Sequence, residues 1–320
     1  MKFLVTGAGG FIGSHIVRAL LKENHTVRVI DNFSTGYRWR LDEVRDSIEL
    51  MEGDICDVDT VRRAVEGVDR ICHQAAIPSV ARSTADPIAS DMANVHGTIT
   101  LLQCAREAGV QRLVYASSSS AYGNTPELPK HEKMTPNPLS PYAVSKLAAE
   151  QYCKSFAGLG FVETVCLRYF NVFGPMQDPT SSYAAVIPKF CLDILNGRPL
   201  TLNGDGSVTR DFTYIENVVQ ANLLALTKPG VSGTVANIGC GERHDLNQLI
   251  QFIGEALGIE PQIEYNPPRP GDVQDSLADI TVARTVLGYD PKVSFKEGLR
   301  RTAEWYREHG ADVVQKSTRN

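Results

Sequence analysis

The sequence predicts an α/β protein, with a doubly wound parallel sheet first and a smaller α/β domain after it. As far as about residue 175, short apolar runs alternate with segments in which apolar residues recur at helical spacing. A glycine-rich turn separates the first apolar run from the first helical segment. Strands and helices in regular alternation form a mainly parallel sheet covered on both faces, because a helix must return the chain between parallel strands.

Each expected element follows from a local pattern. The first strand, at 3–5, is an apolar run closed by glycines, and the helix at 12–22 carries Ile12, Ile16 and Leu20 on one side. The second strand, at 27–30, ends at Asp31. Further strands are expected at 48–51, 70–73, 112–116 and 162–167, and further helices at 58–65, 87–108 and 142–156. Prolines interrupt the alternation beyond about residue 175, and two helices are expected near the C-terminus, at 280–287 and 295–308.

Composition excludes several functional classes. The chain has 320 residues, with 37 acidic and 32 basic side chains and a formal net charge of -5, so no basic surplus is available to bind nucleic acid. No apolar stretch is long enough to span a membrane, and the first apolar run is too short for a signal peptide. The seven cysteines form no C-x-x-C pair, so we expect reduced thiols, no metal and a soluble cytoplasmic protein.

The first turn is predicted to bind a dinucleotide. Gly7, Gly10 and Gly13 lie between the first strand and the first helix, where such a motif needs a tight turn, a bare backbone beside the pyrophosphate and close packing of helix on strand. Asp31 ends the second strand, where a carboxylate accepts hydrogen bonds from the adenosine ribose and repels a 2′-phosphate. NAD is therefore expected rather than NADP. A solvated strand end is the alternative interpretation of Asp31.

A tyrosine and a lysine one helical turn apart are the candidate catalytic groups. Tyr142 and Lys146 are spaced i and i+4, and the serine run 117–120 follows a strand at the carboxyl edge of the sheet. An ammonium and a positive nicotinamide near the phenol are expected to lower the pKa of Tyr142 toward neutrality. The alternatives are a surface pair for Tyr142 and Lys146, and a flexible polar loop for the serines.

These motifs together resemble the extended short-chain dehydrogenase/reductase superfamily, which has a Rossmann fold. Within it, the chain resembles the nucleotide-sugar epimerases of the NAD-dependent epimerase/dehydratase family. Further shared motifs are His73-Gln74-Ala75-Ala76, Asn94-Val95-x-Gly97-Thr98, Arg168-Tyr169-Phe170-Asn171 and Thr209-Arg210-Asp211-Phe212. In the family, the serine four positions before a Tyr-Gly dipeptide is catalytic, which selects Ser118. The resemblance implies an NAD-binding Rossmann domain over 1–174, to which a later segment, about 209–240, is a candidate to return, and a UDP-sugar-binding domain over 175–320.

The resemblance also assigns ligand positions. Ser118, Tyr142 and Lys146 are the implied catalytic residues. The implied NAD-binding residues are Gly7, Gly10, Phe11, Ile12, Gly13, Asp31, Asn32, Gly36, Asp54, Ile55, Gln74, Ala75, Ala76, Asn94, Ser117, Tyr142, Lys146 and Tyr169. The implied UDP-sugar-binding residues are Ser79, Ser118, Ser119, Tyr142, Asn171, Ala185, Val186, Asn203, Arg210, Arg269, Asp272 and Ser276. Among these, Asn171, Arg210 and Arg269 match positions that hold the diphosphate, and two guanidiniums suit a diphosphate because they are planar, forked donors.

The family comparison favours 4-epimerisation of a UDP-hexose. Dehydratases and decarboxylases carry an acidic residue where this chain has Ser118-Ser119-Ser120, and the acid–base chemistry of a dehydratase needs such carboxyl groups. The small Ser276 leaves room for an N-acetyl group and favours UDP-N-acetylglucosamine, whereas Pro78 replaces a smaller glycine and leaves UDP-glucose as the second candidate. UDP-glucuronate is the third candidate.

Two other functional classes stay open. A net reductase would release its cofactor at each turnover, and an NAD-sensing regulator without catalysis would typically lack the tyrosine or the lysine. The resemblance further implies a homodimer formed through the helices at 87–108 and 142–156. His73 is expected to be a packing or backbone-bonding residue rather than a base.

Overall fold

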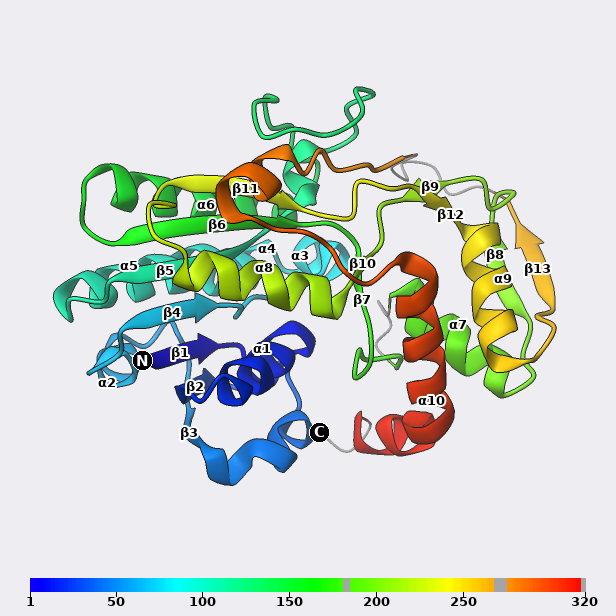
Figure 1. Ribbon diagram of the computed structural model, residues 1–320, viewed down its shortest axis with the longest axis horizontal. Coiled ribbons are helices and arrows are strands. Elements are labelled where there is room, and N and C mark those ends of the chain that lie inside the picture. The colour runs from blue at the N-terminus through cyan, green and yellow to red at the C-terminus, as the bar shows by residue number, and fades with distance from the viewer. Residues whose placement is uncertain (181–184, 268–274, 318–320) are drawn as a thin grey trace.

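A seven-stranded, fully parallel sheet dominates the computed structural model, which describes residues 1–180, 185–267 and 275–317 (Figure 1). The sheet strands are β1 (Lys2–Thr6), β2 (Thr26–Asp31), β3 (Ile48–Glu52), β4 (Arg70–His73), β5 (Arg112–Ser118), β6 (Glu163–Tyr169) and β11 (Thr234–Ile238). Their order is β11-β6-β5-β4-β1-β2-β3. The α/β fold class and the six strands expected from the sequence are therefore confirmed, and β11 is an additional strand at the β6 edge.

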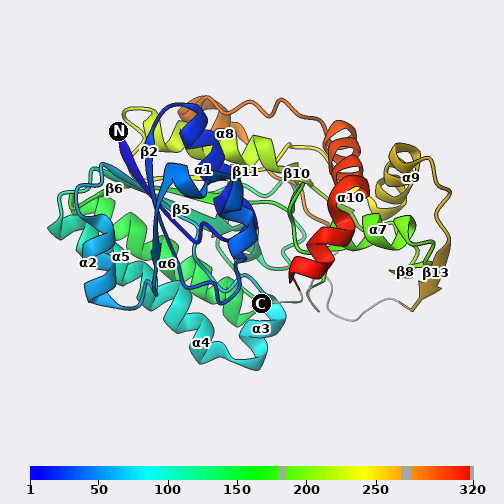
Figure 2. The same ribbon diagram turned by 90° about the horizontal axis from the view of Figure 1, so that it is seen from below.

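The helices of the chain cover the two faces of this sheet or lie in a second lobe beside it (Figure 2). They are α1 (Phe11–Lys22), α2 (Val58–Val65), α3 (Val80–Ala85), α4 (Pro87–Asp91), α5 (Gly97–Glu107), α6 (Pro141–Gly158), α7 (Val186–Leu195), α8 (Ile215–Thr227), α9 (Leu246–Leu257) and α10 (Phe295–Ser317). Short 3₁₀ or π segments are η1 (Arg38–Ser47), η2 (Met92–His96), η3 (Ser119–Tyr122) and η4 (Ala283–Leu287). α1 and α8 pack together on one face, and α2, α5 and α6 cover the other.

Alternation along the first strand explains the two cores. Phe3 and Val5 belong to the hydrophobic cluster on the α1 and α8 side, whereas Leu4 belongs to the cluster with α2 and α5. All three side chains are fully buried. Successive residues of a strand point to opposite faces, so a strand covered on both faces must be apolar at every position. This is why the parallel strands are visible in the sequence as unbroken apolar runs.

A second lobe lies beyond the carboxyl ends of the strands. It contains α7, α9 and α10 and three two-stranded sheets, which pair β7 (Val172–Phe173) with β10 (Thr213–Tyr214), β8 (Leu200–Asn203) with β13 (Ile263–Asn266), and β9 (Thr209–Arg210) with β12 (His244–Asp245). α10 packs on α9 and α7 (Figure 1). α8 and β11, which fall within residues 209–240, pack with the large sheet. A domain boundary at 174/175 stays a prediction.

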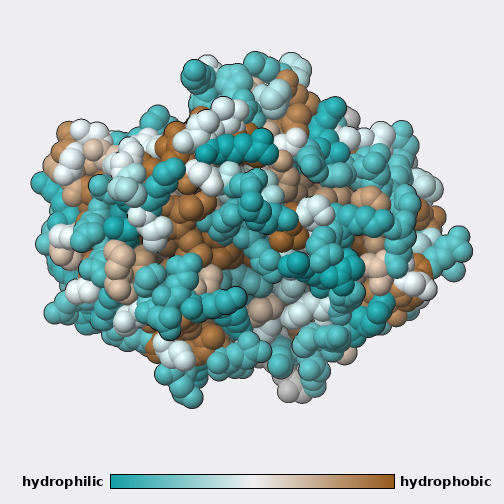
Figure 3. Space-filling view, in the orientation of Figure 1, coloured by the Kyte–Doolittle hydropathy of each residue, from teal (hydrophilic) through white to brown (hydrophobic). Residues whose placement is uncertain are grey.

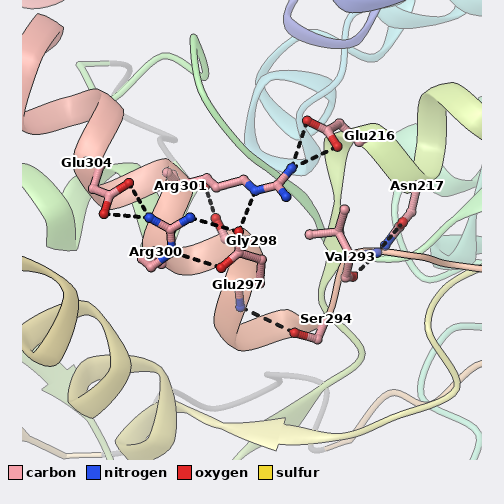
Figure 4. A network of polar contacts seen from close by, with 10 residues as sticks. Glu216, Asn217, Val293, Ser294, Glu297, Gly298, Arg300, Arg301 and Glu304 are labelled. Carbon is pink, nitrogen blue, oxygen red and sulfur yellow. Dashed lines mark hydrogen bonds and ion pairs between the residues drawn. The ribbon is translucent and has the colours of Figure 1, made fainter.

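The start of α10 joins the second lobe to the sheet layer (Figure 4). The Arg301 guanidinium donates to Glu297 on its own helix at 2.7 Å and to Glu216 on α8 at 3.0 Å. The buried Asn217 side chain accepts hydrogen bonds from the amides of Lys292 and Val293 and donates to the Val293 carbonyl. The segment that leads into α10 is therefore held on α8.

Two expected helices differ in detail from the structure. The helix expected at 87–108 is divided into α4, the π-helical η2 and α5, and the hydroxyl of Thr98 donates to the Asn94 carbonyl within this irregular turn at 2.6 Å. A π-turn adds a residue without breaking the apolar spacing on either side, so periodicity cannot reveal it. The last helix begins at Phe295 as expected but continues to Ser317 rather than ending at 308.

A membrane span requires an apolar surface and a long apolar helix. The face seen in Figure 1 is mostly hydrophilic, and its apolar residues lie in separate groups (Figure 3). None of the helices in the described ranges is both long and apolar enough to cross a bilayer.

Candidate active site

A cleft of about 780 Å³ opens at the carboxyl edge of the large sheet. The strand order reverses its direction of growth between β1 and β4, and open α/β sheets bind ligands outside the strand ends at such a point. A second cavity of about 320 Å³ adjoins the cleft, and both are lined by Asn171, Val172 and Ala185. The two cavities together run from the glycine-rich turn to the second lobe.

The glycine-rich turn is packed so closely that side chains would not fit. A Cβ added to Gly7, whose φ is +68°, would lie 2.6 Å from the Ala75 amide nitrogen, and one added to Gly13 would lie 2.2 Å from the Gly7 carbonyl oxygen. Gly10 precedes α1, so the first amides of that helix face the cleft without a side-chain cap. The turn therefore presents bare backbone and a helix N-terminus, which fits the diphosphate of a dinucleotide.

Asp31 lies beside this turn as expected. Its carboxylate accepts hydrogen bonds from the amides of Gly9 at 2.8 Å and Phe33 at 2.7 Å, and burial raises its pKa. Asn32 follows Asp31 and donates to the Asp54 carboxylate at 2.9 Å. Each carboxylate oxygen of Asp31 keeps a lone pair, so the group can still accept hydrogen bonds from two ribose hydroxyls.

Most of the residues expected to bind the cofactor line the cleft. They are Gly7, Gly10, Phe11, Ile12, Gly13, Asp31, Asn32, Gly36, Asp54, Ile55, Gln74, Ala75, Ala76, Ser117, Tyr142, Lys146 and Tyr169. Asn94 is the exception, because its side chain lies in the wall behind the cleft. Its amide group donates to the Ser145 hydroxyl at 3.0 Å and its oxygen accepts from the Ile77 amide at 2.8 Å. Asn94 therefore supports the helix that carries Tyr142 and the Ile77 backbone from behind the cleft surface.

His73 has hydroxyl partners rather than the expected backbone ones. Its Nδ1 lies 2.7 Å from the Thr6 hydroxyl, and its Nε2 lies 2.9 Å from the Thr98 hydroxyl. Because the Thr98 hydroxyl donates to a carbonyl, it must accept from Nε2–H, and Nδ1 then accepts from Thr6. Burial lowers the pKa of His73 to about 3, so the ring stays neutral at pH 7.

Ser118, Tyr142 and Lys146 converge on the cleft from two elements. Ser118 ends β5, and its oxygen accepts hydrogen bonds from the Ser120 amide and lies 2.9 Å from the Ser120 hydroxyl. Tyr142 and Lys146 lie on the first turns of α6, which is capped by the Ser140 hydroxyl. The ammonium of Lys146 lies 4.4 Å from the centroid of the buried Tyr115 ring. A phenol, a neighbouring hydroxyl and an ammonium thus line one cavity.

Burial shifts the pKa of both ionisable groups toward the neutral form. It raises the pKa of the Tyr142 phenol, and the neighbouring Ser118 hydroxyl partly offsets this effect. Burial also lowers the pKa of Lys146 to about 8. The sequence predicted that the Lys146 ammonium and a positive nicotinamide together lower the pKa of Tyr142, whereas in the protein alone burial is the largest influence and raises it.

The residues expected to bind substrate are divided between the cavities and their walls. Ser79, Ser118, Tyr142, Asn171 and Ala185 line the large cleft, and Asn171, Ala185, Val186 and Arg210 line the smaller cavity. Three other expected residues that the structure describes, Ser119, Asn203 and Ser276, line neither cavity. The Ser276 hydroxyl accepts a hydrogen bond from the Asn171 amide group at 3.1 Å and so supports Asn171 from behind. Arg269 and Asp272 lie outside the described residues.

The sequence reasoning missed several polar residues of the cleft. Arg40, Arg82, Gln177 and Asp178 all line it. Arg40 and Arg82 belong to no recognised motif, whereas Gln177 and Asp178 lie in the segment 170–179 that resembles the family but were given no role in the site. For Arg40, the sequence showed only a positive charge in the segment after Asp31. Charge alone does not distinguish a buried arginine, which Arg40 is, from an exposed one.

Comparison with known proteins adds a family and several relatives. The model of the NAD dependent epimerase/dehydratase family matches residues 3–239. A protein named UDP-glucose 4-epimerase from Mycolicibacterium smegmatis is 40% identical over 311 residues, which cover 96% of this chain and 99% of that protein.

Two solved structures are similar over nearly their whole length. UDP-glucose 4-epimerase from Thermotoga maritima, solved with UDP-glucose, has a TM-score of 0.91 and 37% identity, covering 96% of this chain and 99% of that one. UDP-N-acetylglucosamine 4-epimerase from Methanobrevibacter ruminantium, solved with UDP-N-acetylmuramic acid, has a TM-score of 0.91 and 36% identity, covering 96% and 98%.

Proposed function

Because the chain belongs to the NAD-dependent epimerase/dehydratase family, we propose that it is a UDP-hexose 4-epimerase whose preferred pair is UDP-N-acetylglucosamine and UDP-N-acetylgalactosamine. The observation that carries the proposal is the shared cleft, in which Ser118, Tyr142 and Lys146 lie between the glycine-rich turn and a second cavity lined by Asn171 and Arg210. Such a cleft can hold a dinucleotide and a nucleotide sugar end to end.

NAD is the cofactor, and the glycine-rich turn and Asp31 are the residues that would hold it. When bound, NAD supplies reversible hydride transfer at C4 of the sugar. Lys146 would orient the nicotinamide ribose and contribute positive charge. Among the residues that the structure describes, no side chain or carbonyl accepts a hydrogen bond from the Lys146 ammonium, so its donors are available to a ligand.

The protein residues of the reaction then have distinct tasks. Tyr142, as phenolate, takes the proton of the 4-hydroxyl while C4 is oxidised, and returns it after the 4-keto sugar has turned in the pocket. Ser118 bridges the sugar hydroxyl and the phenol, since it ends β5 beside Tyr142. The forward and reverse steps cancel, so the reaction consumes no net oxidant and the cofactor is best kept bound.

The carboxylates of the cleft support epimerisation over dehydration. Positions 118–120 carry hydroxyls, and Asp31 and Asp54 lie beside the glycine-rich turn. Asp178 also lines the cleft, but one of its oxygens accepts from the Tyr37 hydroxyl and the other from Thr180. Among the described lining residues, these three carboxylates accept hydrogen bonds from protein groups other than Tyr142, whereas a dehydratase needs an acid and a base at the neighbouring carbons of the sugar.

The size of residue 276 supports the acetylated substrate. Ser276 supports Asn171, and Asn171 lines both cavities, so a bulky side chain at position 276 would displace Asn171 or enter the sugar site. Pro78 and Ser79 also line the cleft, and a proline is larger than the glycine that the hexosamine relatives tend to have, so it leaves less space for the sugar. This narrowing, and the relatives named for UDP-glucose, keep UDP-glucose and UDP-galactose as the second candidate pair.

We also propose a homodimer formed through α4 and α6. These two helices pack side by side (Figure 2), and they expose Ile88, Val144 and Tyr152, of which Ile88 is 76% exposed. Exposed apolar side chains on adjacent helices are typical of a surface that a second copy covers.

The test is turnover without added cofactor. The purified protein is incubated separately with UDP-N-acetylglucosamine and UDP-glucose, and the 4-epimers are separated by chromatography. Conversion of the acetylated sugar supports the proposal, and conversion of UDP-glucose alone would replace the preferred pair by the second. Absence of both epimers, even with NAD supplied, would refute it. Tyr142→Phe should abolish conversion, whereas Tyr152→Phe on the exposed side of the same helix should not.

A further inference from the structure

Arg40 is a buried cation whose partners are backbone carbonyls on two separate segments. Its side chain in η1 is 2% exposed, and its guanidinium lines the cleft. One nitrogen donates to the Gly9 carbonyl in the glycine-rich turn at 3.0 Å, and Nε donates to the Met176 carbonyl at 3.0 Å. Hydrogen bonds from a charged donor are stronger than neutral ones, and the planar guanidinium fixes the angle between its two acceptors.

The Gly9 peptide is held on both sides. Its carbonyl accepts a second hydrogen bond, from the Tyr37 amide at 2.9 Å, and its amide donates to the Asp31 carboxylate at 2.8 Å. The position of the Gly9 backbone constrains the next residue, Gly10, which lines the cleft before the N-terminus of α1. Arg40 and Tyr37 thus hold the backbone directly before the part of the turn that lines the cleft.

The other acceptor belongs to a segment, residues 175–178, that side chains from several elements hold. The Pro175 carbonyl accepts from His15 on α1 at 3.0 Å, and the Gln177 carbonyl accepts from the Tyr306 hydroxyl on α10. The Asp178 carboxylate accepts from the Tyr37 hydroxyl at 2.8 Å. Met176 has a φ of +65°, a left-handed conformation that a non-glycine residue keeps only when its surroundings fix it.

Segment 175–178 also borders the ligand site. Gln177 and Asp178 line the cleft, and the segment follows Asn171, which lines both cavities. α10, which carries Tyr306, is itself tied to α8 through Arg301 and Glu216 (Figure 4). Arg40 is therefore the cation that connects the cofactor turn to the start of the second lobe.

We infer that Arg40 is a positioning residue that fastens the glycine-rich turn to segment 175–178 and thereby slows release of the dinucleotide. The inference deepens the proposed function, because an epimerase must retain its cofactor between the two hydride transfers. Burial lowers the pKa of Arg40 to about 10, so the guanidinium keeps its charge at neutral pH. The carboxylate of Asp178 and the phenols of Tyr37 and Tyr306 face it and favour that charge.

The experiment measures cofactor release rather than turnover. Protein loaded with NADH is diluted into excess NAD, and the decay of bound-NADH fluorescence gives the dissociation rate. Arg40→Met should raise this rate by about 10- to 100-fold, since it removes two charge-assisted hydrogen bonds. Arg40→Lys should raise it less, because an ammonium keeps the charge but not the fork. Arg38→Met is the matched control: Arg38 is two residues away, exposed, and pairs with Glu52.

The outcomes separate this inference from the proposed function. A rate for Arg40→Met within about twofold of wild type, or an equal rise for Arg38→Met, would overturn the inference. If Arg40→Met does not fold, as judged by thermal unfolding, Tyr306→Phe tests the same segment from α10. This variant should raise the NADH dissociation rate by a few-fold, and an unchanged rate would count against the inference. If NADH release responds as expected but no UDP-sugar is epimerised, only the proposed function fails.

Discussion

Replacing Glu150 should destabilise the protein strongly, because Glu150 and Arg168 form a buried ion pair. Glu150 is 0% exposed and Arg168 is 3% exposed. The guanidinium donates to both carboxylate oxygens, at 2.9 and 2.7 Å, and the Ser117 hydroxyl donates to one of them at 2.7 Å. In Glu150→Gln the guanidinium stays buried without a counter-charge. Breaking a buried pair from one side costs about 3–5 kcal/mol, so we expect a loss of that size in the free energy of unfolding.

Urea unfolding at pH 7.5 measures this loss. Glu43→Gln is the control, because Glu43 pairs with Arg18 at the surface, where an ion pair contributes about 1 kcal/mol or less. The double variant Glu150→Leu with Arg168→Met should recover most of the stability, since it removes both charges. A loss below about 1 kcal/mol in Glu150→Gln, or a double variant as unstable as the single one, would refute this reasoning.

The same substitution should also affect catalysis. Ser117 precedes the catalytic candidate Ser118 on β5, and Glu150 lies one helical turn after Lys146 on α6. The ion pair joins α6 to β6, and the hydrogen bond from Ser117 to Glu150 joins α6 to β5, so Glu150 links the two elements that carry the candidate catalytic groups. We expect kcat of Glu150→Gln to fall with little change in KM, because the second cavity and Arg210 are not touched.

Three further predictions concern substrate, charge and assembly. Ser276→Tyr should lower kcat/KM for UDP-N-acetylglucosamine by about 100-fold more than kcat/KM for UDP-glucose, measured by chromatography of the epimers. Burial lowers the pKa of Lys146 to about 8, below its value of 10.5 in the unfolded chain, so the unfolded chain binds that proton more tightly. The free energy of unfolding should accordingly rise by up to about 3 kcal/mol between about pH 8 and pH 10.5, measured by urea titration. Lys146→Met should abolish this rise, whereas Lys154→Met, on the exposed side of α6, should retain it. Ile88→Glu with Val144→Glu should convert a dimer into a monomer by light scattering, and a wild-type monomer would remove the proposed interface.

The sheet and the cofactor turn were predictable because their signals are local. A strand covered on both faces must be apolar throughout, as at Phe3, Leu4 and Val5, and this requirement is visible in a few consecutive residues. The same is true of Gly7 and Gly13, where the packing leaves no room for a Cβ. Both are constraints on residue type at fixed spacing, which a single sequence displays directly.

The walls of the site were less predictable because they depend on contacts between distant segments. Ser276 and Asn94 were expected at the ligand surface, but each supports another residue that lies closer to it, Asn171 in one case and the Tyr142 helix in the other. Their side chains are equally able to bind a ligand or a neighbour. Which of the two they contact is decided by packing, and the π-turn that carries Asn94 leaves no mark in the apolar pattern.

The contacts that hold segment 175–178 show why some functional residues leave no signal at all. His15, Arg40 and Tyr306 each donate to a backbone carbonyl, and their acceptors are the consecutive residues 175, 176 and 177. Every residue type has a carbonyl, so the accepting positions carry no chemical signature in the sequence. The donors are recognisable only once the fold has brought α1, η1 and α10 to one place. In such a cofactor site, the glycine-rich turn and the strand ends can be recognised in the sequence. The groups that we infer to control cofactor release can be recognised only in the structure.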